Sequence, residues 1–246
     1  MGEKKNALVV IDPQNDFCDR KGSLYVDGAE EDIERLSGYI EKKSAEIAGI
    51  FVSLDSHDGV AIFHPAFWWG ADGQGVGGHP APFTQISSAD FKSGKWKVVS
   101  PSNEPFAALT LDVMDARGAG ALMIWPKHCV VSTWGHQIAA PLQDALQEWR
   151  EAAGLAVRYV FKGENPYTDQ FSVFEGLNDS YPETSFNENF FARLAEFEQV
   201  TFAGEALSHC VRESLLSYIR RLGKTGNGAK QKIRLLMDCT SPVAGF

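Results

Sequence analysis

A series of short apolar runs, separated by stretches with helical spacing, constrains the fold of this chain most. The runs occupy residues 7–11, 50–54, 121–124, 155–161, 200–203 and 233–237. Continuous apolar runs of this length are typical of strands that are buried on both faces. Because these strands alternate with helices along the chain, we expect an α/β fold of three layers, with a central, mostly parallel sheet and helices on both sides.

Helical stretches are predicted at residues 28–47, 105–117, 134–153 and 188–197, and again after residue 210. Apolar side chains three or four residues apart define the side of a helix that packs on the sheet. The predicted buried stripes are Ile33, Leu36, Ile40 and Ile47 in the first helix, Ile138, Leu142, Leu146 and Trp149 in the third, and Val211, Leu215, Leu216 and Ile219 in the last.

The length of 246 residues suffices for one α/β domain with a sizeable core, so we expect a single domain over residues 1–246. A segment at about 58–118 is long and rich in glycine, proline and aromatic residues, and we predict a loop insertion there with a small strand at 95–99. Such a segment is typical of a lid or binding loop, or of an excursion that packs its own aromatic side chains.

The charge and cysteine content exclude several classes of protein. The net charge is -9, which disfavours a nucleic-acid partner because phosphate binding needs a basic face. No apolar run approaches the length that spans a membrane, and the charged start of the chain does not resemble a signal peptide. The four cysteines, Cys18, Cys129, Cys210 and Cys239, form no C-x-x-C pair, which favours reduced thiols and a cytoplasmic location.

Chemistry-bearing residues follow three of the predicted strands. Asp12 follows the first run, Lys162 ends the fourth, and Cys210 lies in the first helical turn after the run that Gly204 interrupts. A helix N-terminus favours an anion, so the Cys210 thiol can ionise at neutral pH there. Together the three residues supply a base, a cation and a nucleophile. Taken singly, each has a plainer reading: a turn aspartate, a surface lysine and a buried cysteine.

A second set of residues has the composition of a metal site. Asp55 and His57 follow the second predicted strand, and His128 follows the run at 121–124. Two imidazoles and one carboxylate from neighbouring strand ends suit zinc or another first-row dication and leave positions for water or substrate. Asp-x-His also occurs as a simple hydrogen-bonded loop pair. Cys129 follows Pro126 in a loop rather than a helix start, so we expect it to be structural.

These motifs resemble the cysteine hydrolases of the isochorismatase-like superfamily, and among them the nicotinamidases most closely. The matching segments, in chain order, are Asp12-Pro13-Gln14-Asn15-Asp16-Phe17, Asp55-Ser56-His57, Trp125-Pro126-Lys127-His128-Cys129, Lys162-Gly163 and Gly204 to Cys210. The resemblance extends from Ala7 to the end of the chain. The chain departs from the pattern at Ser56, where nicotinamidases often carry Trp, and at His64, which lies further from His57 than expected.

The resemblance implies a catalytic group of Asp12 as base, Lys162 as its charge partner and Cys210 as nucleophile. Nicotinamide would be converted to nicotinate and ammonia through a thioester. A carbamoyl or other small-amide hydrolase, similar to N-carbamoylsarcosine amidase, is the alternative, followed by isochorismatase-type vinyl-ether hydrolysis and a non-catalytic binding relative. The expected partner is therefore a small-molecule amide, and a homo-oligomer is left open.

The resemblance also implies the details of the site. Asp55, His57 and His128 would bind one divalent metal, with zinc expected. The peptide bond between Glu205 and Ala206 would be cis, and the N–H groups of Ala206 and Cys210 would form the oxyanion hole. The positions that contact the substrate ring would be Phe17, Trp125 and Phe171.

Overall fold

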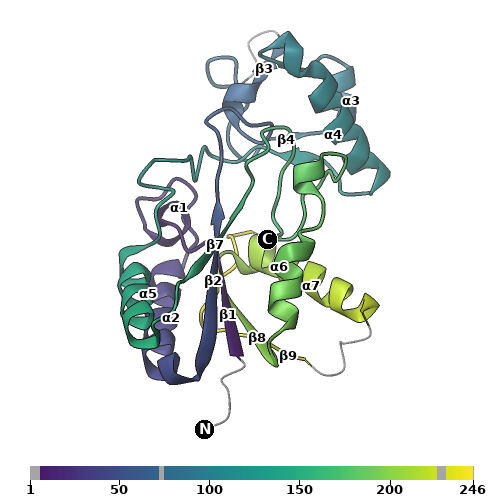
Figure 1. Cartoon of the computed structure of the whole chain (residues 1–246). Helices are drawn as coiled ribbons and strands as arrows, with labels where there is room; N and C mark the ends of the chain where they lie inside the picture. Colours follow the sequence, from purple (N-terminus) through teal and green to yellow (C-terminus); the bar gives the residue numbers. More distant parts are fainter. Residues whose placement is uncertain (1–5, 72–74, 226–230, 246) are drawn as a thin grey trace.

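The computed structural model of the chain describes residues 6–71, 75–225 and 231–245, and its centre is a five-stranded sheet in the order β7-β2-β1-β8-β9 (Figure 1). Every pairing in this sheet is parallel. The strands are β1 (Asn6–Ile11), β2 (Ile47–Asp55), β7 (Arg158–Lys162), β8 (Gln199–Gly204) and β9 (Lys232–Leu235). The predicted α/β fold with a parallel sheet is confirmed.

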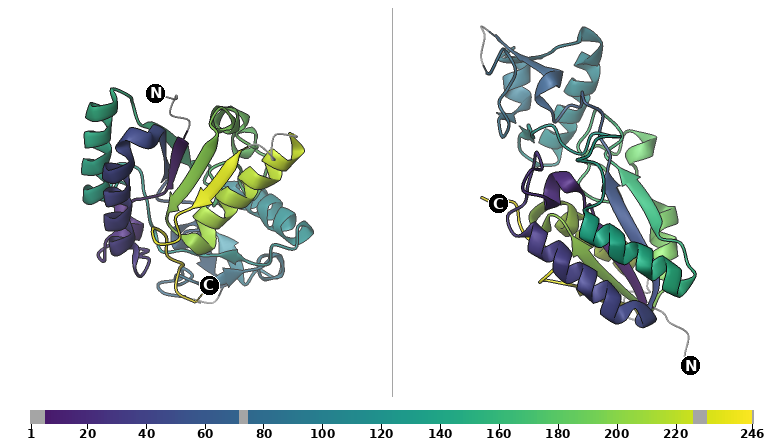
Figure 2. Two further views of the ribbon diagram at one scale, coloured as in Figure 1. Left: turned by 90° about the horizontal axis from the view of Figure 1, so that it is seen from below. Right: turned by 90° about the vertical axis from the view of Figure 1, so that its left-hand side faces the viewer.

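Helices cover both faces of the sheet, as the view from below in Figure 2 shows. On one side lie α2 (Ala29–Lys43) and α5 (Ala140–Ala153), which pack against each other. On the other lie α6 (Glu188–Ala195) and α7 (Arg212–Lys224). In β1, Leu8 and Val10 belong to the first of two hydrophobic clusters and Val9 to the second. Both faces of the strand are therefore buried, which explains its continuous apolar run.

The helix that follows Cys210 begins with a π-helical turn, Leu207–Val211, before α7. The predicted stripe on this helix was partly wrong: Val211 is buried, but Ile219 is 44% exposed, and Leu215 and Leu216 are only half-buried. The buried residues of α7 are Ser214, Ser217, Tyr218 and Leu222. Because a π turn holds more residues than an α turn, the phase of the helix differs from a regular 3.6-residue count.

The region 58–118 is folded and lies at the carboxyl end of the sheet, at the top of Figure 1. It contains an antiparallel pair, β3 (Trp68–Gly70) with β5 (Trp96–Val98), and the helices α3 (Ser88–Lys92) and α4 (Glu104–Ala116). The short 3-10 segments are Pro65–Phe67 and Pro101–Asn103 here, and Ser44–Glu46 and Pro182–Thr184 elsewhere. The expected small strand and the expected helix are both present.

The run at 121–124 was wrongly placed in the main sheet. Its only regular part is β6 (Leu122–Met123), which pairs antiparallel with β4 (Gln85–Ile86). The partner of β6 lies in the insertion, so this strand continues the insertion rather than the parallel sheet. His128 consequently reaches the site on a loop, where Val130 forms an isolated parallel bridge with His57.

The helix predicted at 134–153 begins only at Ala140. The residues before it pair with the segment after β1: the N–H of Asn15 donates to the carbonyl of Gln137 (2.8 Å), and Gln14 forms an antiparallel bridge with Ile138. This pairing leads into the short helix α1 (Asn15–Cys18). The backbone of residues 134–138 therefore pairs with the segment after β1, and this part of the predicted helix is not helical.

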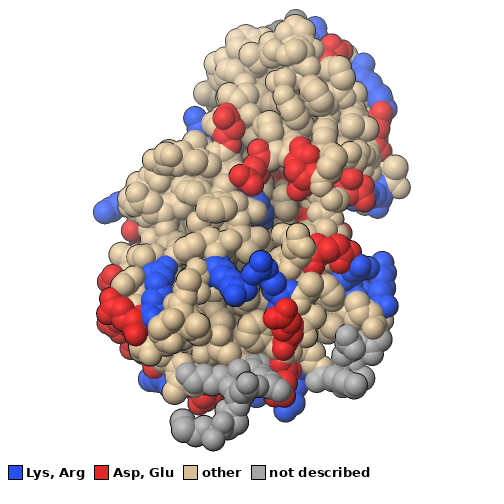
Figure 3. Space-filling view, viewed as in Figure 1, with Lys and Arg blue, Asp and Glu red and all other residues tan. Residues whose placement is uncertain are grey.

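The surface and the helix lengths complete the description. On the face shown in Figure 3, basic and acidic side chains are interspersed over the lower half of the molecule.

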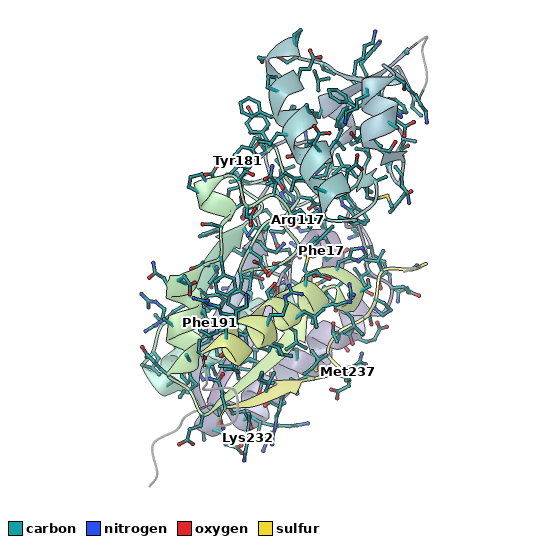
Figure 4. The ribbon with its side chains drawn as sticks, turned by 90° about the vertical axis from the view of Figure 1, so that its right-hand side faces the viewer. Phe17, Arg117, Tyr181, Phe191, Lys232 and Met237 are labelled. Atoms are coloured by element: carbon teal, nitrogen blue, oxygen red, sulfur yellow. The ribbon has the colours of Figure 1, made fainter. Side chains whose placement is uncertain are left out.

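Within the described residues, none of the helices combines the length and the apolar character needed to span a membrane. Arg117, labelled in Figure 4, joins the end of α4 to the segment after β7, because it donates to the carbonyl of Leu177 (2.6 Å) and pairs with Asp179 (2.7 Å).

Candidate active site and metal-ligating group

Asp12 follows β1 at the carboxyl edge of the sheet and is fully buried. Its φ of 44° lies in the left-handed region, where aspartate is found more often than most residues. Ser53 of the neighbouring strand forms two hydrogen bonds with Asp12. The Asp12 N–H donates to Ser53 Oγ (3.0 Å), and Ser53 Oγ donates to Asp12 Oδ1 (2.6 Å). Burial, supported by the charge of Asp55, raises the pKa of Asp12 against the opposing effect of Lys162.

Lys162, the last residue of β7, is the cation between two carboxylates. Its Nζ lies 2.9 Å from Asp12 Oδ2 and 2.8 Å from Asp55 Oδ1, and it also donates to the carbonyl of Gln170 (3.1 Å). Burial would lower the pKa of Lys162, but the two carboxylates outweigh it and raise the pKa well above its usual value. The lysine is therefore a permanent positive charge that neutralises part of a buried acidic cluster.

Cys210 lies in the π-helical turn, with its Sγ 3.6 Å from Lys162 Nζ. Ligand atoms of Asp12, Asp55 and Cys210 all lie within 4.8 Å of one another. Burial raises the pKa of the Cys210 thiol well above its usual value, although the charge of Lys162 acts in the opposite direction. Loss of solvation and the two nearby carboxylates therefore oppose the thiolate that the helix N-terminus was expected to favour.

The loop between β8 and Cys210 has a special backbone. The Glu205–Ala206 peptide bond is cis, as predicted. Gly204 has a φ of 106°, and a Cβ there would lie 2.1 Å from the carbonyl oxygen of Ile11. Only glycine fits where β8 passes so close to β1. Ala206 and Cys210, the predicted oxyanion residues, both line the same pocket.

Asp55, His57 and His128 come together as predicted, with ligand atoms within 4.8 Å of one another. Asp55 Oδ2 lies 2.9 Å from His57 Nε2 and 3.6 Å from His128 Nε2. The other ring nitrogens contact backbone carbonyls: His57 Nδ1 lies 2.9 Å from Gly163 O, and His128 Nδ1 lies 2.7 Å from Pro126 O. Backbone partners at Nδ1 fix the tautomer that presents an Nε2 lone pair, which is how metal-binding imidazoles are oriented.

His64 is a further residue of this group, and the sequence did not assign it a role. It is fully buried, and neither of its ring nitrogens has a hydrogen-bond partner. Its ring centroid lies 5.7 Å from that of His57 and 5.4 Å from that of His128. Burial and the nearby imidazoles lower its pKa to about 2, so it is a neutral imidazole. An unpartnered neutral imidazole beside three ligand-type residues fits a cation at this position.

One pocket joins these groups to the predicted ring-contacting residues. Phe17, Trp125 and Phe171 line it together with Asp55, His128, Ala206 and Cys210. The ring of Phe17 lies 5.5 Å from that of His128, and Figure 4 places Phe17 near the base of the insertion. The pocket therefore has aromatic walls, and the Cys210 thiol lines it together with Asp55 and His128, two of the three residues of the metal-ligating group Asp55, His57 and His128.

Four further residues line the pocket and were not singled out in the sequence: Leu24, Asp169, His209 and Val243. His209 directly precedes the nucleophile, and its ring centroid lies 5.3 Å from that of Trp125. Its position directly before Cys210 in the sequence could have identified it as a pocket residue. Asp169 and Val243 come from irregular segments, whose course no local pattern predicts. Cys129 is not among the lining residues, and its N–H donates to Asp16 Oδ2 (2.7 Å).

Comparison with known proteins agrees with this geometry, although no family model matches the chain. The chain is 26% identical to the nicotinamidase of Saccharomyces cerevisiae over 241 residues, which cover 96% of this chain and 88% of that protein. It is 24% identical to the nicotinamidase of Escherichia coli over 215 residues, covering 87% and 76% respectively.

Solved structures share the fold. The yeast nicotinamidase superposes with a TM-score of 0.64 at 21% identity, covering 98% of this chain and 89% of that chain. The pyrazinamidase of Pyrococcus horikoshii in complex with zinc superposes with a TM-score of 0.55 at 20% identity, covering 98% and 88%. The chain is therefore similar over most of its length to two curated nicotinamidases, and its fold is that of solved nicotinamidase structures.

Proposed function

We propose that this chain is an amidohydrolase that converts nicotinamide to nicotinate and ammonia through a thioester on Cys210. The observation that carries the proposal is the pocket that is lined by the Cys210 thiol, by Asp55 and His128 of the metal-ligating group, and by the aromatic walls of Phe17, Trp125 and Phe171. The yeast and Escherichia coli relatives, both nicotinamidases, support the same reaction. They do not favour the carbamoyl hydrolase or the vinyl-ether hydrolase.

The reaction begins with a proton transfer inside the buried cluster. Cys210 is a neutral thiol at rest, so Asp12 takes its proton as attack begins. Lys162 lies within 3.6 Å of the sulfur and 2.9 Å of Asp12 Oδ2, so it stabilises negative charge on either group as the proton moves. The buried site strengthens this interaction because no bulk water screens it.

The thiolate then attacks the amide carbonyl carbon, and the carbonyl oxygen takes up the negative charge. The N–H groups of Ala206 and Cys210 would hold that oxyanion, since both residues line the pocket beside the sulfur. As the tetrahedral intermediate collapses, the C–N bond breaks and Asp12 returns the proton to the leaving nitrogen. Ammonia departs and an acyl thioester on Cys210 remains.

Water completes the reaction. It attacks the thioester carbonyl, Asp12 accepts a proton from it, and the C–S bond breaks. The sulfur recovers its proton from Asp12, and the carboxylic acid is released. The same base thus acts in both halves of the reaction, which is why its fixed position between Ser53 and Lys162 matters.

Asp55, His57 and His128 would hold one divalent ion, and His64 lies beside them with both ring nitrogens unpartnered. We propose zinc, because the donor set suits it and the Pyrococcus horikoshii pyrazinamidase is a zinc complex. When bound, such an ion supplies Lewis acidity and an open position that suits a pyridine nitrogen or water. The aromatic walls select a flat ring, for which stacking is geometrically favourable.

The single domain expected over residues 1–246 and the cytoplasmic location belong to the same proposal. All four cysteines are free in the structure, which supports a reducing compartment.

An ammonia-release assay tests the function. Purified protein is supplied with a panel of small amides that includes nicotinamide, an N-carbamoyl amino acid and a short aliphatic amide, and Cys210→Ala serves as the control. Nicotinamide should be the preferred substrate, and the Cys210→Ala variant should release no ammonia. Preference for the carbamoyl or aliphatic amide would contradict the proposal. Metal analysis of the same protein should find one zinc per chain.

A further inference from the structure

We infer that Asp169 is a positioning residue that holds the Trp125 indole in place as a wall of the substrate pocket. The inference rests on the proposed function, because it assigns Asp169 a part in binding the ring of the substrate. Neither residue belongs to the group that carries the bond-breaking chemistry.

The contact that carries the inference is a buried hydrogen bond. Trp125 Nε1 donates to Asp169 Oδ2 at 3.1 Å, between residues 44 positions apart in the chain. The exposed fractions of the two side chains are 4% for Trp125 and 6% for Asp169. Both residues line the pocket that contains Cys210. A charge-assisted bond in a buried site is stronger than a neutral one in water, and it is directional.

Asp169 is itself held from several sides. Its Oδ1 accepts the N–H of Gln170 (2.9 Å), and its carbonyl accepts the N–H of Leu177 (2.9 Å). The carboxylate is therefore a fixed acceptor rather than a mobile one. Trp125 is anchored independently through its backbone, whose N–H donates to the carbonyl of Phe63 (2.8 Å).

The orientation of the indole matters because other pocket residues contact it edge-on. The interplanar angle between Trp125 and Phe171 is 88° at a centroid distance of 6.3 Å, and that between Trp125 and His209 is 88° at 5.3 Å. These ring contacts restrain the indole by packing, and the hydrogen bond to Asp169 adds a directional restraint at Nε1. Removal of the Asp169 acceptor would therefore loosen the orientation of the indole and weaken the flat wall that it forms.

A different route from Asp169 to activity exists and must be separated from this one. The next residue, Gln170, accepts a hydrogen bond from Lys162 Nζ through its carbonyl (3.1 Å) and one from the Gly163 N–H through its side chain (3.2 Å). A change at Asp169 could disturb Lys162 through this neighbour. That effect would lower kcat and would not depend on the indole N–H of Trp125.

A double-mutant cycle separates the two routes. Asp169→Ala removes the acceptor, Trp125→Phe removes the indole donor, and Asp169→Asn keeps an acceptor oxygen. On nicotinamide, Asp169→Ala should raise KM about tenfold while kcat stays within about threefold, since one charge-assisted hydrogen bond is lost. In the Trp125→Phe background, Asp169→Ala should have no further effect on KM. Asp169→Asn keeps one acceptor oxygen where the carboxylate uses two, so its KM should lie between that of Asp169→Ala and that of the unsubstituted protein.

Three kinetic results would overturn the inference. These are an equal effect of Asp169→Ala in both backgrounds, a fall in kcat at unchanged KM, and unchanged kinetics in Asp169→Ala. For a readout that needs no substrate, the ¹⁵N-¹H resonance of the Trp125 indole is identified by its absence in Trp125→Phe. It should shift in Asp169→Ala, and an unmoved resonance refutes the contact even if nicotinamide is not the substrate. Failure of the proposed function would appear separately, as absence of ammonia release from nicotinamide by the unsubstituted protein.

Discussion

At the scale of single residues, the reactivity of Cys210 depends on its partners rather than on a low pKa. Burial raises the pKa of both Cys210 and Cys129 well above the usual value. Only Cys210 lines the pocket and lies within 3.6 Å of the Lys162 ammonium. The thiolate therefore forms in the course of reaction, with Asp12 as the proton acceptor.

We expect a small, uncharged thiol electrophile to modify Cys210 before Cys129. Entry through the pocket gives the reagent access to Cys210, whereas Cys129 is fully buried and does not line the pocket. Peptide mass spectrometry after brief treatment near neutral pH measures the order of labelling. Lys162→Met should slow the labelling of Cys210 at least about tenfold, because the thiolate loses its nearby cation. Faster labelling of Cys129 would reverse the assignment.

Glu205, which precedes the cis bond, is a buried carboxyl outside the catalytic group. Its Oε2 accepts the N–H of Ser241 (3.1 Å), and its Oε1 has no hydrogen-bond partner. Burial raises the pKa of Glu205 well above its usual value, and the Asp32 carboxyl adds to the rise, whereas Arg35 opposes it. Asp32 in turn accepts a hydrogen bond from Ser241 Oγ. A proton on Glu205 would remove the cost of burying a charge whose second oxygen has no donor.

Stability should therefore fall as pH rises through the folded-state pKa of Glu205. The folded state binds this proton more tightly than the unfolded state, so the contribution is complete below the unfolded pKa and is lost above the folded one. Glu205→Gln keeps a neutral group at every pH. Its free energy of unfolding relative to the unsubstituted protein should rise by at least about 1 kcal/mol between pH 5.5 and pH 8.5. Guanidinium unfolding at both pH values measures this.

The control for that experiment is Glu164→Gln, which removes an exposed carboxylate near the same edge of the sheet. Its effect on the free energy of unfolding should be equal at the two pH values. A pH dependence in Glu205→Gln that matches the control would show that Glu205 carries no bound proton in the folded state.

At the scale of elements, the sequence predicts the sheet edge well and the irregular segments poorly. Asp12 and Lys162 could be placed because the apolar runs of β1 and β7 end beside them. The position of β6 could not be predicted, because a short apolar run has the same sequence pattern in a parallel and in an antiparallel sheet. Pairing with a distant segment, here β4, determines which sheet the run joins. His64 and Asp169 lie where long-range contacts, not local periodicity, set the course of the chain.

The turn after β7 shows how tightly an element end fits the metal-ligating group. Gly163 has a φ of 74°, and a Cβ there would lie 2.4 Å from His57 Cε1 and 2.7 Å from Asp55 Oδ1. Gly154, which ends α5, has a φ of 65° but no atom within 4 Å of such a Cβ. The two glycines thus share the backbone conformation and differ in their surroundings.

We expect Gly163→Ala to lower bound metal and activity, whereas Gly154→Ala should change neither. Both substitutions carry the left-handed penalty of about 1–2 kcal/mol in stability. Only the first adds a clash that displaces His57 and Asp55. Metal content per chain and thermal unfolding, measured side by side, separate the two effects. Full metal content in Gly163→Ala would contradict this prediction, because it would mean that the turn changes its backbone conformation without displacing His57 and Asp55.

At the scale of the whole molecule, the insertion and the main sheet share a hydrophobic cluster. It contains Leu8 and Val10 of β1, and also Trp68 and Leu111 of the insertion. Continuous burial across the boundary favours one cooperative unit rather than two separately folding parts. The insertion also supplies His64 and contacts Trp125 through Phe63 and Phe83, so the pocket depends on it.

Leu111→Ala in α4 should therefore destabilise the entire molecule and not the insertion alone. Leu111 is 1% exposed, and loss of a buried leucine side chain costs about 2–5 kcal/mol. Leu109 of the same helix is 40% exposed, so Leu109→Ala should change stability by less than about 0.5 kcal/mol. Far-ultraviolet circular dichroism and tryptophan fluorescence should report one coincident unfolding transition in each protein. A separate early transition in Leu111→Ala would instead make the insertion an independent folding unit.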